Sequence, residues 1–540
     1  MSRPQGNLAG LKTAQKKRLE RLSSRRVSPG LVISPELARE LAAISHETGR
    51  QIGLLLDRAG RVASVLVGDR KGILIPVLPQ VRGTGGRLKG LRCVHTHLAG
   101  EGLSRDDLMD LACLRLDLMA ALCIDERGYP TLIHRAHLIP AAPGRDPWTL
   151  LEPVHPAHLE EDFLLTVSAL EDEFVRRGGA RHQAGKSDRA ILVSVGRGNR
   201  LEAEASLDEL AELARTAGVE VVARVVQRQK RINPRFIMGR GKLGDIMLMA
   251  LQTDANLLIF DQELNPSQAR SITDHTDMRV IDRTQLILDI FALRARSREG
   301  KLQVEMAQLK YLMPRLASRD DALSRLTGGI GARGPGETKL EIDRRRIKDR
   351  LAMLASRLKT VSRQRDQRRR RRKKNTLPII SLVGYTNAGK STLLNSLTGS
   401  SVMAEDQLFA TLDPTTRRLR FPRDFEVVIS DTVGFISRLP DDLLQAFMAT
   451  LEELAEADLL LHVIDGSSPA MAGQVAAVER IIRELDLARI PMLRVLNKID
   501  LIEEKDKAIM VRDLDAVPLC AKDLATFGSL IGWIEGLIGH

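Results

Sequence analysis

The chain has 540 residues and a formal net charge of +13; 43% of its residues are hydrophobic and only 3% are aromatic. This length allows three or four domains, and the composition predicts aliphatic cores. The positive charge favours a polyanionic partner, or it reflects only a basic, soluble surface. No apolar run reaches the roughly 20 residues of a membrane span, no apolar segment marks a secretion signal, and the four cysteines lack a close metal-type pairing. These features exclude the membrane-spanning and disulfide-rich secreted classes and predict a cytoplasmic protein with reduced thiols.

We expect residues 1–150 to form an α+β extension. Its first 30 residues are polar and basic, as in a mobile arm or a short helix. Ser34-Pro35 is a typical helix start. Residues 51–56 and 62–67 are predicted to form two strands joined by a turn. Residues 73–77 are a candidate third strand.

Two histidines in the extension have the spacing of metal ligands. His95 and His97 lie at i and i+2 of an extended segment, so their side chains point to the same side. Asp107, on a following helix, would complete a three-ligand zinc site, with Glu47 as the candidate general acid or base. The alternative is a pair of partly buried histidines beside the helix N-cap Ser104.

These residues are similar to the JAMM/MPN metalloprotease motif, a His-x-His followed by Ser-x-x-Asp. The gap from His97 to Ser104 is one residue shorter than in that motif, and Leu98 stands where a proline is usual. The resemblance therefore implies an MPN-like fold more readily than an active peptidase.

The middle of the chain is predicted to contain a linker and a second domain. Residues 140–156 are rich in proline and indicate a linker, and we expect a helix over 158–177 and a flexible joint over 178–188. The helical linker thus spans residues 151–188. Strands alternate with helices over residues 189–300, which predicts an α/β domain with a parallel sheet. Its residues 239–242 (GRGK) start a helix, where they form either an anion site or a structural turn.

Residues 301–374 are predicted to form a long helical hairpin. A charged helical pattern runs to residue 316, and another runs from 339 to about 370. Between them, the glycine-rich residues 328–338 (GGIGARGPGET) cannot continue a helix. The basic run at 368–374 is either a solvated linker or a contact with RNA.

A phosphate-binding loop starts the last domain, residues 375–540. An apolar run ends in Gly384, and Gly389, Lys390 and Ser391 follow at the required spacing. The glycines let backbone N–H groups point at phosphate oxygens, Lys390 places its charge on the β and γ phosphates, and the Ser391 hydroxyl binds Mg²⁺. The predicted nucleotide contacts of this loop are Gly384, Tyr385, Thr386, Asn387, Ala388, Gly389, Lys390 and Ser391.

Later motifs select guanine nucleotides. A strand over 425–430 leads to Asp431, Thr432, Val433 and Gly434, an acidic metal-side residue followed by a glycine that meets the γ-phosphate. Further strands lead to Asn497, Lys498, Ile499 and Asp500, and then to Cys520, Ala521 and Lys522. The Asp500 carboxylate can accept two hydrogen bonds from guanine, whereas adenine would leave it unpaired. The predicted class is α/β and multidomain: a P-loop GTPase domain, preceded by an α/β parallel-sheet domain with a long helical hairpin and the α+β extension.

From about residue 190 onward, the sequence resembles the HflX family of ribosome-associated GTPases. The resemblance rests on residues 236–242 (FIMGRGK), 280–284 (VIDRT), 299–305 (EGKLQVE), 328–338, 409–417 (FATLDPTTR) and 431–435 (DTVGF). It implies a monomeric GTPase that binds the 50S subunit and its rRNA and acts in rescue, splitting or recycling of stalled ribosomes. It also places Phe409, Ala410, Thr411, Leu412 and Asp413 in switch I, where Thr411 would meet Mg²⁺ and the γ-phosphate.

Hydrolysis is expected to need outside help. Phe435 stands where Ras-like GTPases have a glutamine that orients water, and a phenyl ring cannot do this by hydrogen bonding. The help comes either from the ribosome or from K⁺ bound by Asn387; alternatively, Asn387 only stabilises the loop. The candidate catalytic residues are Lys390, Thr411, Gly434 and Asn387. Two rival functions remain: a GTP-regulated RNA-binding factor in subunit assembly, and a zinc hydrolase fused to a GTPase.

Overall fold

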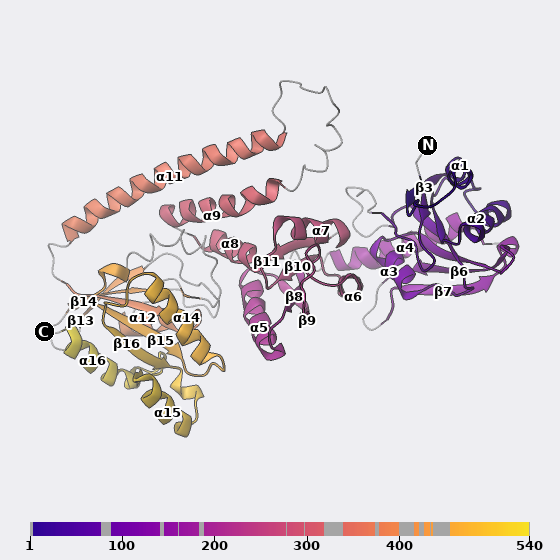
Figure 1. Ribbon diagram of the computed structural model, residues 1–540. Coiled ribbons are helices and arrows are strands. Elements are labelled where there is room, and N and C mark those ends of the chain that lie inside the picture. The colour runs from indigo at the N-terminus through magenta and orange to yellow at the C-terminus, as the bar shows by residue number, and fades with distance from the viewer. Residues whose placement is uncertain are drawn as a thin grey trace. The chain divides into compact units, whose positions relative to one another are not determined.

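Figure 1 presents the protein as a computed structural model. It describes residues 4–76, 88–140, 145–159, 161–182, 188–276, 278–295, 297–317, 339–372, 377–398, 415–420, 426–431, 434–435 and 454–538. The contacts divide the chain into two compact units. One comprises Met1–Ile191, Met238–Leu257 and Ile272–Arg279, and the other Leu192–Ile237, Leu258–Ser271 and Val280–His540. Among the described helices, none combines the length and the apolar character needed to cross a membrane.

A seven-stranded sheet organises the N-terminal part of the chain, in the order β1-β3-β2-β4-β5-β6-β7. Its strands are β1 (Gln5–Gly6), β2 (Ile52–Asp57), β3 (Val62–Val67), β4 (Leu91–His97), β5 (Leu118–Ile124), β6 (Pro130–Leu138) and β7 (Trp148–Val154). The helices are α1 (Thr13–Leu22), α2 (Pro35–Thr48), α3 (Arg105–Cys113) and α4 (Phe163–His182). The predicted helix start is confirmed, because the Ser34 hydroxyl caps α2 by accepting from the Leu37 N–H.

Three expectations for this part are wrong. Residues 73–76 form no strand, and residue 77 lies outside the described residues. Residues 148–154 of the expected linker over 140–156 are β7, which pairs antiparallel with β6. Because β7 is an edge strand, Pro153 is tolerated without a ladder hydrogen bond. The expected joint at 178–182 continues α4, whose Phe163 and Leu170 are buried in the N-terminal core, so this core extends past residue 150.

A four-stranded sheet follows, in the order β11-β10-β8-β9. Its elements alternate as the sequence predicts: β8 (Arg189–Gly196), α5 (Arg200–Thr216), β9 (Glu220–Arg228), α6 (Arg240–Thr253), β10 (Leu257–Phe260), α7 (Pro266–Thr276), β11 (Arg279–Asp282) and α8 (Arg283–Arg294). Buried charges fix the start of α8. The Asp282 carboxylate caps the helix at the Gln285 N–H and accepts from the Tyr311 hydroxyl at 2.6 Å and from Arg315 at 2.9 Å. These contacts tie α8 to the helix that follows it.

Two long helices come next, α9 (Arg298–Ala317) and α11 (Lys339–Arg372). They lie side by side (Figure 1), with an ion pair of 2.6 Å between Glu305 and Arg350. Leu354 of α11 is fully buried. The glycine-rich segment 328–338 lies outside the described residues.

The C-terminal domain contains a six-stranded sheet, in the order β13-β14-β12-β15-β16-β17. The strands are β12 (Ile379–Gly384), β13 (Thr415–Arg420), β14 (Glu426–Asp431), β15 (Leu459–Asp465), β16 (Met492–Asn497) and β17 (Ala516–Pro518). The helices are α12 (Lys390–Thr398), α14 (Met471–Glu484), α15 (Glu504–Leu514) and α16 (Gly528–Ile538). All neighbouring strands are parallel except β13 and β14. The predicted multidomain α/β class is confirmed, and the carboxyl ends of β12, β14 and β16 bring the predicted nucleotide motifs to one edge.

Candidate functional site

The loop between β12 and α12 has two positions whose backbone conformation requires glycine. Gly384 has a φ of 153°, and a Cβ there would lie 2.3 Å from the carbonyl oxygen of Val463 on β15. Gly389 has a φ of 93°, and its Cβ would lie 2.3 Å from Asn497 Nδ2. Asn387 also adopts a positive φ, 63°. The loop therefore takes the curled path that the glycine spacing predicts.

Lys390 is held inside this loop. Its side chain is nearly buried, and Nζ donates to the carbonyl oxygens of Gly384 at 3.0 Å and of Tyr385 at 2.8 Å. Burial lowers the pKa of Lys390 to about 8, and the Asp431 carboxylate opposes this shift. A Cβ on Gly434 would lie 3.0 Å from Nζ. The ammonium group is thus fixed among the loop, Asp431 and Gly434.

Ser391 and Asp431 bring two oxygen donors together. The Ser391 hydroxyl donates to Asp431 Oδ2 at 2.7 Å, and Asp431 is fully buried at the end of β14. A hydroxyl and a carboxylate are hard oxygen ligands of the kind that Mg²⁺ prefers. The donor set therefore fits the Mg²⁺ that the sequence predicts, with Ser391 as ligand and Asp431 beside it.

Asn497 connects the phosphate loop to the two base-recognition motifs. Its Nδ2 donates to the Ala388 carbonyl oxygen at 2.8 Å, and its Oδ1 accepts from the Ala521 N–H at 2.9 Å. Sequence reasoning missed this bridge, because each partner lies more than twenty residues away. It also missed the ion pair of 2.7 Å between Lys498 and Asp465.

Asp500 and Cys520 also come together at the same edge. Burial raises the pKa of the Cys520 thiol, and the hydrogen-bonded Asp500 carboxylate raises it further. Asp500 itself is exposed, in the short helix Ile499–Leu501 that follows β16. Its carboxylate is thus accessible to a nucleobase.

Backbone hydrogen bonds join the phosphate loop to the segment after β14. The Thr386 N–H donates to the Phe435 carbonyl oxygen at 2.8 Å, and the Phe435 N–H donates to the Gly384 carbonyl oxygen at 3.1 Å. The Phe435 side chain is buried, with 3% exposed. The predicted contacts Phe409, Ala410, Thr411, Leu412, Asp413, Thr432 and Val433 lie outside the described residues.

The candidate zinc ligands of the N-terminal extension are also brought together. One ligand atom from each of His95, His97 and Asp107 lies within 4.8 Å of the others. Burial alone would raise the pKa of Asp107, but hydrogen bonds with both histidines hold it well below its usual range, so the carboxylate is ionised. Glu47 is not part of this group: it accepts from Gln15 and pairs with Arg18.

A buried histidine of the C-terminal domain, His462, is expected to lower the stability of this domain at acid pH. Burial lowers the pKa of His462 on β15 from 6.5 to about 4; Arg494 and Lys390 act in the same direction, and Glu479 opposes them. His462 therefore takes up a proton more readily in the unfolded chain than in the folded one. Its contribution to the free energy of unfolding is complete above pH 6.5 and is lost as the pH falls towards 4. The shift corresponds to about 3 kcal/mol.

We therefore expect the opening free energy of β15 in the full chain to fall between pH 7 and pH 4, and His462→Leu to remove most of that fall. Hydrogen exchange of β15 peptides measures it, with His158→Gln as an exposed-histidine control. An equal fall in wild type and His462→Leu would contradict the assignment.

Protein-family models match this chain between residues 204 and 498. Three family models match: "GTP-binding GTPase N-terminal" at residues 204–292, "GTP-binding GTPase Middle Region" at 294–372 and "50S ribosome-binding GTPase" at 379–498. GTPase HflX of Caldanaerobacter subterraneus subsp. tengcongensis is 51% identical over 316 residues, which cover 58% of this chain and 73% of the relative. GTPase HflX of Escherichia coli K12 is 47% identical over 329 residues, covering 61% and 76%.

Among solved structures, a GTP-binding protein from the archaeon Sulfolobus solfataricus in complex with GDP is 25% identical to this chain. The match covers 65% of this chain and 98% of that one, with a TM-score of 0.38.

Proposed function

Because this chain belongs to the HflX family of GTPases, we propose that it binds the large ribosomal subunit and uses GTP hydrolysis in the rescue, splitting or recycling of stalled ribosomes. The observation that carries the ribosomal part is the match of residues 379–498 to a 50S ribosome-binding GTPase model. The net charge of +13 and the exposed basic residues on α11, Arg344, Arg345, Arg346 and Lys348, suit an rRNA partner.

The phosphate loop and the two base motifs would bind different parts of the nucleotide. We assign Lys390 and the loop N–H groups to the β and γ phosphates, Gly434 to the γ-phosphate, and Asp500 with the 520–522 segment to guanine. Ser391 would hold Mg²⁺, which supplies positive charge to the phosphates when bound. Asn497 would position these parts through its bonds to Ala388 and Ala521.

The group that orients the attacking water would not come from the position where Ras-like GTPases have a glutamine. Phe435 occupies that position, and its ring is buried. Two sources of the missing stabilisation are compatible with the site. One is a group of the ribosome, and the other is K⁺ bound by Asn387, which has a positive φ in the turn of the loop. Either would supply charge that stabilises the transition state of phosphoryl transfer.

GTP turnover with purified 50S, 30S or 70S particles tests the proposal, in matched K⁺ and Na⁺ buffers. We expect 50S or 70S particles to raise kcat by at least about tenfold, since one missing stabilising group is worth about 10²–10³. If K⁺ acts at Asn387, turnover in K⁺ exceeds that in Na⁺, and Asn387→Ala removes the difference. An equal rate with and without every particle would contradict the ribosomal proposal.

Subunit assembly is the second candidate function, and the basic surface of α11 suits it equally well. Cosedimentation in the GTP state separates the two. Binding to mature 50S or 70S particles supports action on stalled ribosomes, whereas a preference for immature particles supports an assembly role.

A further inference from the structure

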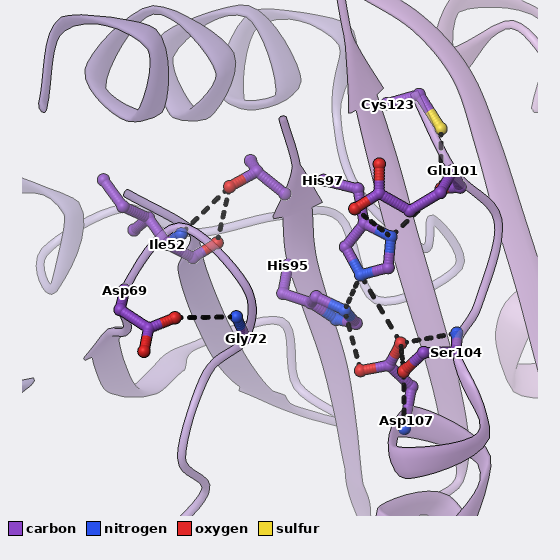
Figure 2. A network of polar contacts seen from close by, with 10 residues as sticks. Ile52, Asp69, Gly72, His95, His97, Glu101, Ser104, Asp107 and Cys123 are labelled. Atoms are coloured by element: carbon purple, nitrogen blue, oxygen red, sulfur yellow. Dashed lines mark hydrogen bonds and ion pairs between the residues drawn. The ribbon is translucent and has the colours of Figure 1, made fainter. Parts of the chain in front are cut away.

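Three side chains of the N-terminal extension direct their donor atoms at one point (Figure 2). His95 Nε2 lies 2.9 Å from His97 Nε2 and 3.1 Å from Asp107 Oδ1, and His97 Nε2 lies 3.4 Å from Asp107 Oδ2. Both histidines come from β4, and Asp107 comes from the first turn of α3. These contacts form a closed triangle of two imidazoles and one carboxylate.

Small residues flank this triangle in the sheet. In the register of the sheet, His95 lies between Gly53 on β2 and Ala121 on β5, and Ala121 pairs with His134 on β6. Both neighbours are small, and Ile73 covers the Gly53 side, where a Cβ would lie 2.9 Å from its Cδ1. The ring is fully buried, while the Asp107 side chain is 13% exposed. Solvent can therefore reach the triangle from the side of α3.

Hydrogen bonds outside the triangle orient two of its members. The Asp107 carboxylate accepts from the Ser104 N–H at 2.8 Å and from the Ser104 hydroxyl at 2.6 Å. His97 Nδ1 lies 3.0 Å from the carbonyl oxygen of Glu101, and because a carbonyl only accepts, Nδ1 carries the proton. The lone pair of neutral His97 is therefore on Nε2 and points into the triangle. A ring nitrogen fixed by a backbone carbonyl in this way is typical of metal-binding histidines.

When both rings are neutral, the triangle holds a single proton for its three contacts. With His97 Nδ1 protonated, the only proton available among neutral rings is on His95 Nε2, and it faces both His97 Nε2 and Asp107 Oδ1. The contact of 3.4 Å between His97 Nε2 and Asp107 Oδ2 then joins two lone pairs. A cation at the centre would remove this repulsion, and in a buried place the repulsion is poorly screened.

We propose that His95, His97 and Asp107 bind a divalent transition-metal ion, with zinc as the expected metal. Ligand atoms about 2.0–2.2 Å from a metal lie about 3.4 Å apart in a tetrahedral site and about 3.0 Å apart in an octahedral one, close to the three edges of the triangle. Two imidazoles and a carboxylate suit both zinc and ferrous iron. Within the described residues, no fourth protein ligand joins the group, so water would complete the coordination.

The proposal covers metal binding and no hydrolytic step. Thr96, whose side chain alternates with those of His95 and His97, contacts Ser45 of α2 at 2.7 Å. Helix α2 therefore packs on the other face of the sheet, and Glu47 with it. The general acid or base suggested by the sequence is thus absent from the face that holds the triangle.

Metal analysis of the full-length protein tests the site. The chain is stripped with a chelator and reloaded with Zn²⁺, or with Fe²⁺ under anaerobic conditions, in the presence of Mg²⁺ and GDP to occupy the nucleotide site. We expect about one tightly held ion per chain in the wild type and less than about a tenth in Asp107→Asn and His97→Gln. Ser104→Ala, which removes the hydroxyl that donates to the Asp107 carboxylate and caps α3, should weaken binding by about 10–100-fold.

His134→Gln is the matched control, since His134 lies on the same face but outside the triangle. It should keep full occupancy. The Co²⁺ form should show visible d–d bands, and no intense thiolate band is expected because neither Cys93 nor Cys123 belongs to the ligand group, although both lie on the same face of the sheet. Circular dichroism checks that every variant is folded. Equal occupancy in wild type and Asp107→Asn, a thiolate band, or no retained metal in the wild type would each overturn the proposal; the last would leave a proton on His97 as the central cation.

Discussion

Replacing Lys390 with alanine is expected to lower the kcat of GTP hydrolysis by at least about 10²–10³. Lys390 Nζ is fixed by the carbonyl oxygens of Gly384 and Tyr385, at the point where the phosphate loop meets Gly434. A positive charge held here would act on the β and γ phosphates without reorganisation during the reaction. Single-turnover hydrolysis at saturating GTP, with and without 50S particles, measures the loss in both states.

The loss of activity in Lys390→Ala is expected without a loss of folding. Burial lowers the pKa of Lys390 to about 8, so the folded state disfavours its charged form, and removing the ammonium group removes a desolvation cost. Lys505→Ala, on the exposed surface of α15, is the matched control and should hydrolyse GTP like the wild type. If Lys390→Ala kept a rate within about threefold of the wild type, Lys390 would not be the phosphate-binding group.

The phosphate loop was predictable because its constraints are local. Gly384 and Gly389 adopt φ values of 153° and 93°, which favour glycine, so residue type alone reports the backbone path. The spacing of His95 and His97 was equally informative, since alternation along a strand places both rings on one side. The sequence therefore predicted that the side chains of His95 and His97 lie close together, which the structure confirms.

Features that depend on distant partners were not predictable. The role of Asn497 rests on Ala388 and Ala521, which no local pattern connects to it. The segment around β7 was misread as a linker because its prolines are typical of loops, and only its edge position in the sheet makes Pro153 compatible with a strand. Glu47 was predicted as the general acid or base of the zinc site, whereas its helix α2 packs on the other face of the sheet. In each case the missing information is which face or edge an element occupies.

Replacing Asp500 with asparagine should change the preferred base from guanine to xanthine. The carboxylate accepts hydrogen bonds from the N1–H and the 2-amino group of guanine, and an amide in its place would leave one donor facing another. Xanthine carries an oxygen at position 2, to which the asparagine amide can donate. We expect the affinity for GDP to fall by about 10²–10⁴ and the affinity for XDP to rise, because a site built for a hydrogen bond discriminates strongly against a ligand that lacks it.

Competition binding of GDP and XDP to the full chain measures this switch. Asp500 lies in an exposed short helix beside Cys520, so the change should leave the buried bridge from Asn497 to Ala521 intact. Asp506→Asn, on α15, makes the same chemical change outside the site and should keep the guanine preference. The switch is expected in binding and hydrolysis alike, because base recognition and phosphate chemistry involve different residues of the site. An unchanged preference for GDP in Asp500→Asn would mean that the base is recognised elsewhere.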